Sequence, residues 1–418
     1  MGRINYKRTK FACYVAYFTM ASVFCLPPLL FVTFHTLYHI SYTLLGTLVL
    51  TNFCTQLGVD LLFTFFSKRF KVKTVVRVMP LITSLGLMVY AIIPSLFPQY
   101  AYVGLMAGTV LFSVSAGLSE VLLSPLIAAI PSDNPHRDMS LLHSLYAFGV
   151  FTVVCISTLF LKCFGTENWM YLTAILAILP VGASVLFFCS PFPEMEMSTS
   201  GEKESTKKRT VGLALCVACI FLGSCAENTM SNWASSYIEK ALHLDKTVGD
   251  ILGVAMFAVL LGLARIFNAR FGKSIQKTLL VGMIGAGVCY ILAGLSTNGT
   301  VAFLACVLTG LFTAMLWPGT LILMEEKIPG AGVAAFALMA AGGDLGASVA
   351  PQLMGVVIDR VSESAWAAEL GAVLHLSVEQ VGLKTGMLIS SVFPIGGIFL
   401  LLFIIYYFRK NKTGTAKL

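Results

Sequence analysis

Charged residues are scarce in this sequence. Asp, Glu, Lys and Arg make up 11% of its 418 residues, against about 25% in a typical soluble protein, and 57% of the residues are hydrophobic. This balance excludes a soluble globular protein. Because ~20 apolar helical residues cross the ~30 Å core of a bilayer, the twelve long apolar runs predict an all-α membrane protein with 12 transmembrane helices.

Motifs of enzyme chemistry are missing as well. The chain has no Walker loop, no HExxH pair and no G-x-S-x-G in a suitable context. Nearly all of the eleven cysteines lie in apolar runs, including the C-x-x-C of Cys216 and Cys219, where small apolar packing is the expected role. We therefore expect a protein that is not an enzyme and that uses no cofactor or metal.

The positive charge is present, but it is confined to the segments between apolar runs. Of the 28 Lys and Arg residues, 22 lie in the two termini, the central polar segment and every second loop, and five lie in the opposite loops. By the positive-inside rule both termini are cytoplasmic. The charge therefore sets topology, with no nucleic acid as partner. We expect a multi-pass monomer in the plasma membrane (the cell inner membrane), with the lipid bilayer and a small solute as its partners.

The chain divides into two halves that echo each other. Residues 1–190 form an N-terminal half of six spans, the polar segment 191–210 reads as a cytoplasmic linker, and residues 211–418 form a C-terminal half of six spans. SKRFKVKT (Ser67–Thr74) follows the second span and NARFGKSIQKT (Asn268–Thr278) follows the eighth. Six spans, a linker and six spans with a repeated basic turn are typical of a two-half transporter.

The two basic turns carry a family resemblance that extends over nearly the whole chain. They resemble the loop signature of the major facilitator superfamily, Gly-x-x-x-Asp-Arg-x-Gly-Arg-Arg. Lys68 stands where that signature has its acid and Lys71 where it has its second glycine, whereas the second copy keeps Gly272. The resemblance implies the major facilitator fold, with two pseudo-symmetric six-helix halves.

Four further stretches resemble the fucose-permease-type sugar:proton symporters and their uncharacterised bacterial relatives. These stretches are NFCTQLGVDLLF (Asn52–Phe63), SLLHSLYAFG (Ser140–Gly149), ENTMSNWASSY (Glu227–Tyr237) and AGGDLGASVAPQLMG (Ala341–Gly355). The resemblance implies a sugar as solute and a proton as coupling ion.

Three acids fall near mid-membrane when depth is counted at ~1.5 Å per helical residue. Glu120, Asp60 and Asp344 lie ~16, ~12 and ~18 Å from the cytoplasmic face. Intramembrane acids are costly and mark ion pathways by default. We predict that Glu120 and Asp60 carry the proton and that Asp344 takes part in a relay. The alternatives are a helix-to-helix hydrogen bond for Glu120, a buried polar seam for Asp60, and simple packing in a glycine cluster around Asp344.

His143 lies only ~6 Å inside the membrane if its span begins near Met139. A histidine titrates near neutral pH, so His143 is a candidate relay between Glu120 and the cytoplasm. A hydrogen bond at a gate or loop is the alternative.

Solute recognition has candidates in both halves. In the first half, Asn52 and Gln56 share a helix face with Asp60 and suggest a wet, cavity-facing stripe. In the second half, carboxylate and amide groups that can bracket hydroxyls stand beside aromatic rings that can stack on a sugar. The second-half candidates are Glu227, Asn228, Asn232, Trp233 and Trp317. A polar cluster at the outer gate, interfacial tryptophan and plain packing are the alternatives.

Arg265 is the lone cation inside a span. It either pairs with an acid to latch the inner gate or snorkels toward the cytoplasm, and snorkelling is the interpretation that we favour.

The sequence as a whole predicts a secondary active transporter that moves a small polar solute, a monosaccharide or related polyol, by proton symport with alternating access. Carboxylate and amide oxygens serve Na⁺ as well as H⁺, so the coupling ion stays open. Two other hypotheses are proton-coupled efflux of amphipathic compounds and a non-transporting membrane sensor. The fifth span (HSLYAFGVFTVVC) lacks the Gly-x-x-x-Gly-Pro pattern of drug antiporters, which disfavours efflux.

Overall fold

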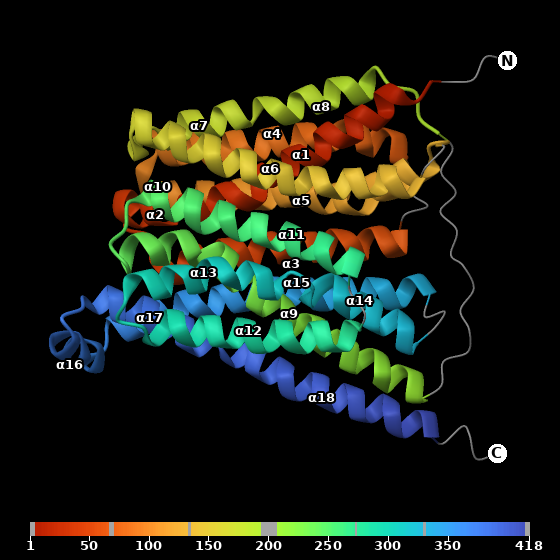
Figure 1. Cartoon of the computed structure of the whole chain (residues 1–418). Coiled ribbons are helices and arrows are strands. Elements are labelled where there is room, and N and C mark those ends of the chain that lie inside the picture. The colour runs from red at the N-terminus through yellow and green to blue at the C-terminus, as the bar shows by residue number, and fades with distance from the viewer. Residues whose placement is uncertain are drawn as a thin grey trace. The chain divides into compact units, whose positions relative to one another are not determined.

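A computed structural model describes residues 5–66, 71–132, 135–193, 207–271, 274–328 and 332–413. Side chains at some helical positions next to the gaps lie outside this description. The described residues form helices joined by short connections (Figure 1). The basic turn residues Lys68 and Gly272 fall in the gaps, so these two positions of the loop signature lie outside the described residues.

The chain divides into two compact units. Unit 1 contains Met1–Ile40 and Thr51–Ser198, and unit 2 contains Ser41–Leu50 and Thr199–Leu418. The switch between units at residues 198 and 199 lies within the segment that the sequence predicts as a linker. The exchange at residues 41–50 concerns one helix, α3 (Tyr42–Phe66), whose first turns belong to unit 2 and whose remainder belongs to unit 1.

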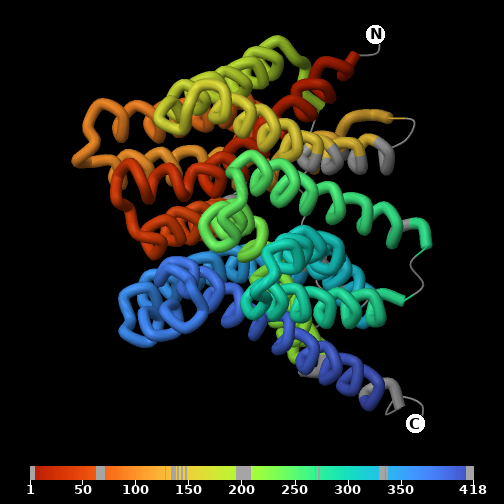
Figure 2. The backbone as a smooth tube through the Cα atoms, turned by 60° about the vertical axis from the view of Figure 1, so that its left-hand side comes forward, coloured from red at the N-terminus to blue at the C-terminus, as the bar shows by residue number. Residues whose placement is uncertain are grey.

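Unit 1 packs its helices side by side, and Figure 2 shows them in red, orange and yellow. α4 lies on α5, α1 lies on α6, and α8 contacts both α1 and α4. Besides α3, the helices are α1 (Lys7–Leu29), α2 (Phe31–Tyr38), α4 (Val72–Leu96), η2 (Pro98–Tyr100), α5 (Ala101–Ala129), α6 (Pro135–Phe164), η3 (Thr166–Asn168), α7 (Trp169–Leu176) and α8 (Ile178–Phe188).

Unit 2 is built around α9, which contacts α15, α18, α14 and α13. Its helices are α9 (Lys207–Lys240), α10 (Lys246–Val248), the π-helical η4 (Gly249–Ala255), α11 (Met256–Phe271), α12 (Ile275–Leu295), α13 (Gly299–Thr313), α14 (Leu316–Lys327), α15 (Gly332–Ser362), α16 (Ala365–Leu374), α17 (Val378–Ser390) and α18 (Val392–Thr413).

Ten helical stretches of the described chain are long and apolar enough to cross a membrane. α6 and α15 are long helices, with 30 and 31 residues. The side chains at some of their positions lie outside the description. Several predicted spans consist of two helices in line, because proline lacks the N–H that a continuous helix needs. The first span breaks at Leu30 after Pro27 and Pro28, and the tenth breaks at Ala314 and Met315 ahead of Pro318.

Close helix contact in both units depends on glycine. In unit 1 a Cβ added to Gly108 on α5 would lie 2.7 Å from the backbone nitrogen of Tyr90 on α4. In unit 2 a Cβ added to Gly346 on α15 would lie 2.3 Å from the carbonyl oxygen of Phe221 on α9. Small residues let helix backbones approach in this way without a hydrophobic driving force from water.

Candidate functional site

Two of the predicted proton carriers come together in unit 1. Asp60 on α3 and Glu120 on α5 lie close enough to interact electrostatically, and Tyr17 on α1 lies within the same range of Glu120. Asp60 is half-buried and Glu120 is exposed at the surface of the protein. Two acids at hydrocarbon depth repel each other when both are ionised, so this pair is suited to share or exchange protons.

The predicted polar stripe of α3 is buried instead of facing an open cavity. Asn52 and Gln56 are buried, and Gln56 Nε2 donates to Asn52 Oδ1 over 3.1 Å. Ser113 on α5 donates its hydroxyl to the same Asn52 oxygen over 2.6 Å. These bonds form a polar seam between α3 and α5, which is the alternative that the sequence leaves open for this face, and a solute role for Asn52 and Gln56 stays a prediction.

Of the two relay candidates, His143 and Asp344, the structure describes the side chain of Asp344 only. α6 begins at Pro135, four residues before the predicted start at Met139, so His143 lies deeper in its helix than expected, and its side chain is outside the described part of the structure. Asp344 is buried on α15. Beside it, a Cβ added to Gly343 would lie 2.2 Å from the ring of Trp317, so the glycines here serve helix packing and Trp317 fills the space that they leave.

Trp233 is part of the core of unit 2. It is 0% exposed, its Nε1 donates to the carbonyl oxygen of Pro351 over 3.0 Å, and its ring lies 5.7 Å from that of Tyr42. Asn232, also buried, donates to the carbonyl oxygen of Asn228 over 2.8 Å. Both side chains pack inside unit 2, and a solute role for them stays a prediction.

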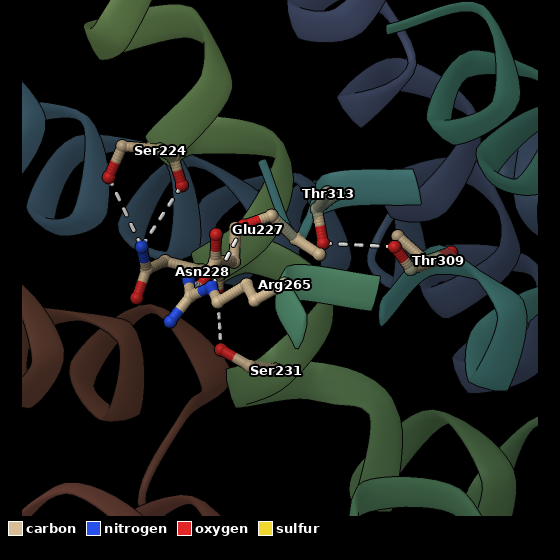
Figure 3. Close-up of polar contacts among 8 residues, drawn as sticks. Ser224, Glu227, Asn228, Ser231, Arg265, Thr309 and Thr313 are labelled. Atoms are coloured by element: carbon tan, nitrogen blue, oxygen red, sulfur yellow. Dashed lines mark hydrogen bonds and ion pairs between the residues drawn. The ribbon is translucent and has the colours of Figure 1, made fainter. Parts of the chain in front are cut away.

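Glu227 and Arg265 form an ion pair that the sequence does not specify. Nη2 of Arg265 on α11 lies 3.4 Å from Oε1 of Glu227 on α9 (Figure 3). The Arg265 side chain is 42% exposed and that of Glu227 is 19% exposed. Next to Glu227, Asn228 donates its Nδ2 to the hydroxyl and the carbonyl oxygen of Ser224, each over 3.1 Å. Arg265 therefore pairs with an acid, and whether it also snorkels or the pair serves as a gate stays a prediction.

A proline explains where the guanidinium points. A helical carbonyl is normally bonded by the N–H four residues later, and for Ala314 that residue is Pro318, which has no N–H. The Nε–H of Arg265 donates a hydrogen bond to this carbonyl oxygen over 2.9 Å. Arg265 is thus held by a backbone acceptor on one edge and by Glu227 on another.

Two further ionised clusters were not predicted from the sequence. Asp250 is fully buried in η4, accepts a hydrogen bond from Ser235 and lies 3.4 Å from Nζ of Lys246. The spacing of Lys246 and Asp250, i and i+4, is the signal that a sequence search could have used. At the other end of the spans, Lys10 lies 2.5 Å from Asp138 and holds the pKa of that carboxyl below its usual range.

A third unpredicted cluster binds the N-terminus of α3 within unit 2. Asp359 on α15 accepts the backbone N–H groups of Tyr42 over 3.1 Å and of Thr43 over 2.6 Å. The Tyr42 hydroxyl donates to Glu379 on α17 over 2.5 Å. A carboxylate at a helix N-terminus satisfies orphan N–H groups and complements the helix dipole. Asp359 caps α3 from 316 residues away in the chain.

Comparisons with known proteins agree with this architecture. The sequence profile described as Major Facilitator Superfamily matches residues 12–351. No curated protein matches. A bacterial homolog to the human lysosomal transporter Spinster has 13% identity and a TM-score of 0.74, with 98% of this chain and 99% of that chain covered.

Two other solved structures share the fold at similarly low identity. A D-xylose-proton symporter has 17% identity and a TM-score of 0.73, covering 93% of this chain and 97% of that chain. The nucleoside transporter NupG has 12% identity and a TM-score of 0.71, covering 94% and 99%.

The fold and its charged groups inside the spans thus define a multi-pass integral membrane protein of the secondary transporter class. The chain belongs to the major facilitator superfamily. The predicted all-α membrane fold is confirmed.

Proposed function

We propose that this protein is a proton symporter for a small polar solute, a monosaccharide or related polyol, working by alternating access. Glu120 and Asp60 in unit 1 carry the proton. Glu227, Asn228 and Arg265 in unit 2 contact the solute. The observation that carries the proposal is the charged and polar set at hydrocarbon depth in both units, because such groups are retained in membranes for transport pathways.

The acid neighbours of unit 1 support the proton as coupling ion. Asp60 has Glu120 as an electrostatic neighbour. A site that holds two carboxyl groups lowers its repulsion by binding a proton, and it releases that proton when water reaches it. The resemblance to fucose-permease-type symporters and the fold shared with a D-xylose-proton symporter favour a sugar as the solute.

The positive-inside bias places both termini and the residue 191–210 segment in the cytoplasm. This orientation and residence in the plasma membrane, the cell inner membrane, are part of the proposal. Attachment of a fluorescent protein or a phosphatase reporter at residue 418 tests it, since each reporter is active on one side of the membrane only.

Transport in proteoliposomes tests the coupling. A thermal-shift screen of the purified protein against sugars, polyols, nucleosides and small acids first identifies a stabilising solute. Uptake of that solute is then driven by an imposed pH gradient, with K⁺ in place of Na⁺ to separate the two coupling ions. We expect Glu120→Gln to abolish accumulation and to leave exchange of labelled for unlabelled solute intact, because exchange needs no net proton movement.

The matched control is Glu369→Gln, which changes an exposed acid on α16. It is expected to accumulate solute as the native protein does. Normal gradient-driven accumulation by Glu120→Gln contradicts the assignment of Glu120, and accumulation that requires Na⁺ contradicts proton coupling.

A further inference from the structure

The ion pair of unit 2 is loosely held and open on one side. A guanidinium has five N–H donors, and the contacts of Arg265 to described residues are Nε with Ala314 and Nη2 with Glu227. The pair distance of 3.4 Å exceeds the 2.7–2.9 Å that is common for charge-assisted bonds. With 42% of the side chain exposed, the guanidinium still presents donors in the planar fork that suits carboxylates.

The partner acid is left incompletely satisfied. Oε2 of Glu227 is buried and has no hydrogen-bond partner among the described residues. A buried charged oxygen without a donor is destabilising, and a proton on that oxygen removes its charge. When Glu227 takes up a proton, it therefore stops acting as the counterion of Arg265.

The surroundings of Glu227 contain few other charges. Arg265 is the charged group that acts on it from α11. On α13, the Thr313 hydroxyl donates to the carbonyl oxygen of Thr309 within the same helix (Figure 3). On α15, Asp344 lies two residues before Gly346, at which an added Cβ would meet Ser224 on α9. On α17, Lys384 is directed to the carbonyl oxygen of Ser296.

We propose that Arg265 binds the carboxylate of a monoanionic, hydroxyl-bearing solute such as a sugar acid, and that Glu227 takes up a proton as the solute displaces it. The charge of the site is zero before binding, from Glu227 and Arg265. It is zero after binding as well, from protonated Glu227, Arg265 and the solute anion. Neutrality in both states avoids a net charge in a low-dielectric site. This inference rests on the proposed function and narrows its solute class to carboxylated polyols.

Calorimetry on the purified full-length protein tests the inference with D-glucuronate as probe and D-glucose as its neutral counterpart. Titrations in two buffers of different protonation enthalpy measure protons taken up on binding. We expect glucuronate to bind more tightly than glucose and to take up about one proton near neutral pH. In Glu227→Gln, glucuronate should still bind but take up no proton at this site, since the neutral amide leaves Arg265 permanently available.

The arginine variants separate charge from geometry. We expect Arg265→Gln to weaken glucuronate binding by about tenfold to a hundredfold, in keeping with the loss of charge-assisted hydrogen bonds, and to weaken glucose binding less, because glucose has no carboxylate. Arg265→Lys keeps the charge without the fork, and it serves if the glutamine variant fails to fold. Arg360→Gln, at an exposed arginine near the end of α15, is the matched control.

The outcomes divide cleanly. The inference is overturned if glucuronate binds no more tightly than glucose, or if neither Arg265→Gln nor Arg265→Lys changes the affinity for glucuronate. In either case, glucose binding and proton-driven uptake still support the proposed symport. Glucuronate binding without any proton uptake overturns the role of Glu227. Binding of neither probe overturns the inference, and the solute screen and the Glu120→Gln transport assay then decide the proposed function separately.

Discussion

Units 1 and 2 hold their intramembrane acids in opposite ways. In unit 1 the electrostatic neighbour of Asp60 is a second acid, Glu120. In unit 2, Glu227 faces Arg265 and Asp250 faces Lys246. An acid beside an acid favours uptake of a proton, whereas an acid beside a cation stays ionised until something displaces it. In the proposed function, the acid pair of unit 1 carries the coupling proton and the Glu227–Arg265 pair of unit 2 binds the solute.

We expect the largest effect when a cation is placed beside the acids of unit 1. Asp60→Lys places an ammonium beside Glu120, and we expect gradient-driven accumulation to fall by about tenfold or more, because 1.4 kcal/mol of ion-pair energy shifts a protonation equilibrium tenfold. Asp60→Asn is the conservative control, because it removes one acid without adding a cation. Exchange activity and thermal unfolding of each variant show whether the protein is folded. Unchanged accumulation by a folded Asp60→Lys protein removes the proton-exchange role from unit 1.

Both units have close helix contacts at glycine, so a bulkier residue at such a glycine should lower the stability of either unit. Gly346→Ala puts a methyl group 2.3 Å from a carbonyl oxygen of α9, and we expect a loss of about 1–3 kcal/mol in stability from overpacking. The control is Gly262→Ala on α11, where an added Cβ meets nothing within 4 Å. Thermal unfolding in detergent compares the two, and equal midpoints contradict the close packing of α15 on α9.

Removing one charge from each unit should move stability in opposite directions. Arg265→Gln leaves Glu227 without its counterion, and the Ala314 carbonyl must find another donor, so we expect a loss of about 1–2 kcal/mol. Asp60→Asn removes repulsion between two acids, and we expect a gain of up to about 1 kcal/mol. Unfolding curves of both single variants and the native protein measure the difference. A shift of the same sign in both variants contradicts the contrast between the units.

The smallest expected effect concerns acid pH and lies at the ends of the spans. The pKa of Asp138 is lowered in the folded state by Lys10. Its contribution is therefore present above the unfolded pKa of about 3.9 and is lost as the pH falls through the lower folded value. The pair is partly exposed, so we expect less than about 1 kcal/mol. Native protein and Lys10→Gln should differ in thermal midpoint near neutral pH and converge in strong acid, and a constant difference contradicts the pairing.

Much of the fold is predictable from the sequence because hydropathy acts locally. Each span carries its own apolar run, and a polar residue within a run is visible without any structure. The break in the tenth span is predictable in the same way, because Pro318 cannot donate an N–H. The short apolar helix α16 lies between the last two predicted spans.

The partners of the polar residues are less predictable, because pairing depends on which helix faces fold together. Glu227 and Arg265 are 38 residues apart, and hydropathy has no information about their contact. The sequence is compatible with Trp233 as a sugar platform or as core, and it does not indicate the contacts of Trp233 with Pro351 and Tyr42. The seam of Asn52 and Gln56 depends likewise on Ser113 of another helix.

The bond between Arg265 and the Ala314 carbonyl has a consequence for biogenesis. An arginine inside a span opposes membrane insertion, and a carbonyl without its N–H is costly in lipid as well. Both spans are strongly apolar, and the bond satisfies one polar group in each of them. The bond couples the eighth span to the tenth, and we expect the eighth to reach its full stability in the bilayer after the tenth has been synthesised.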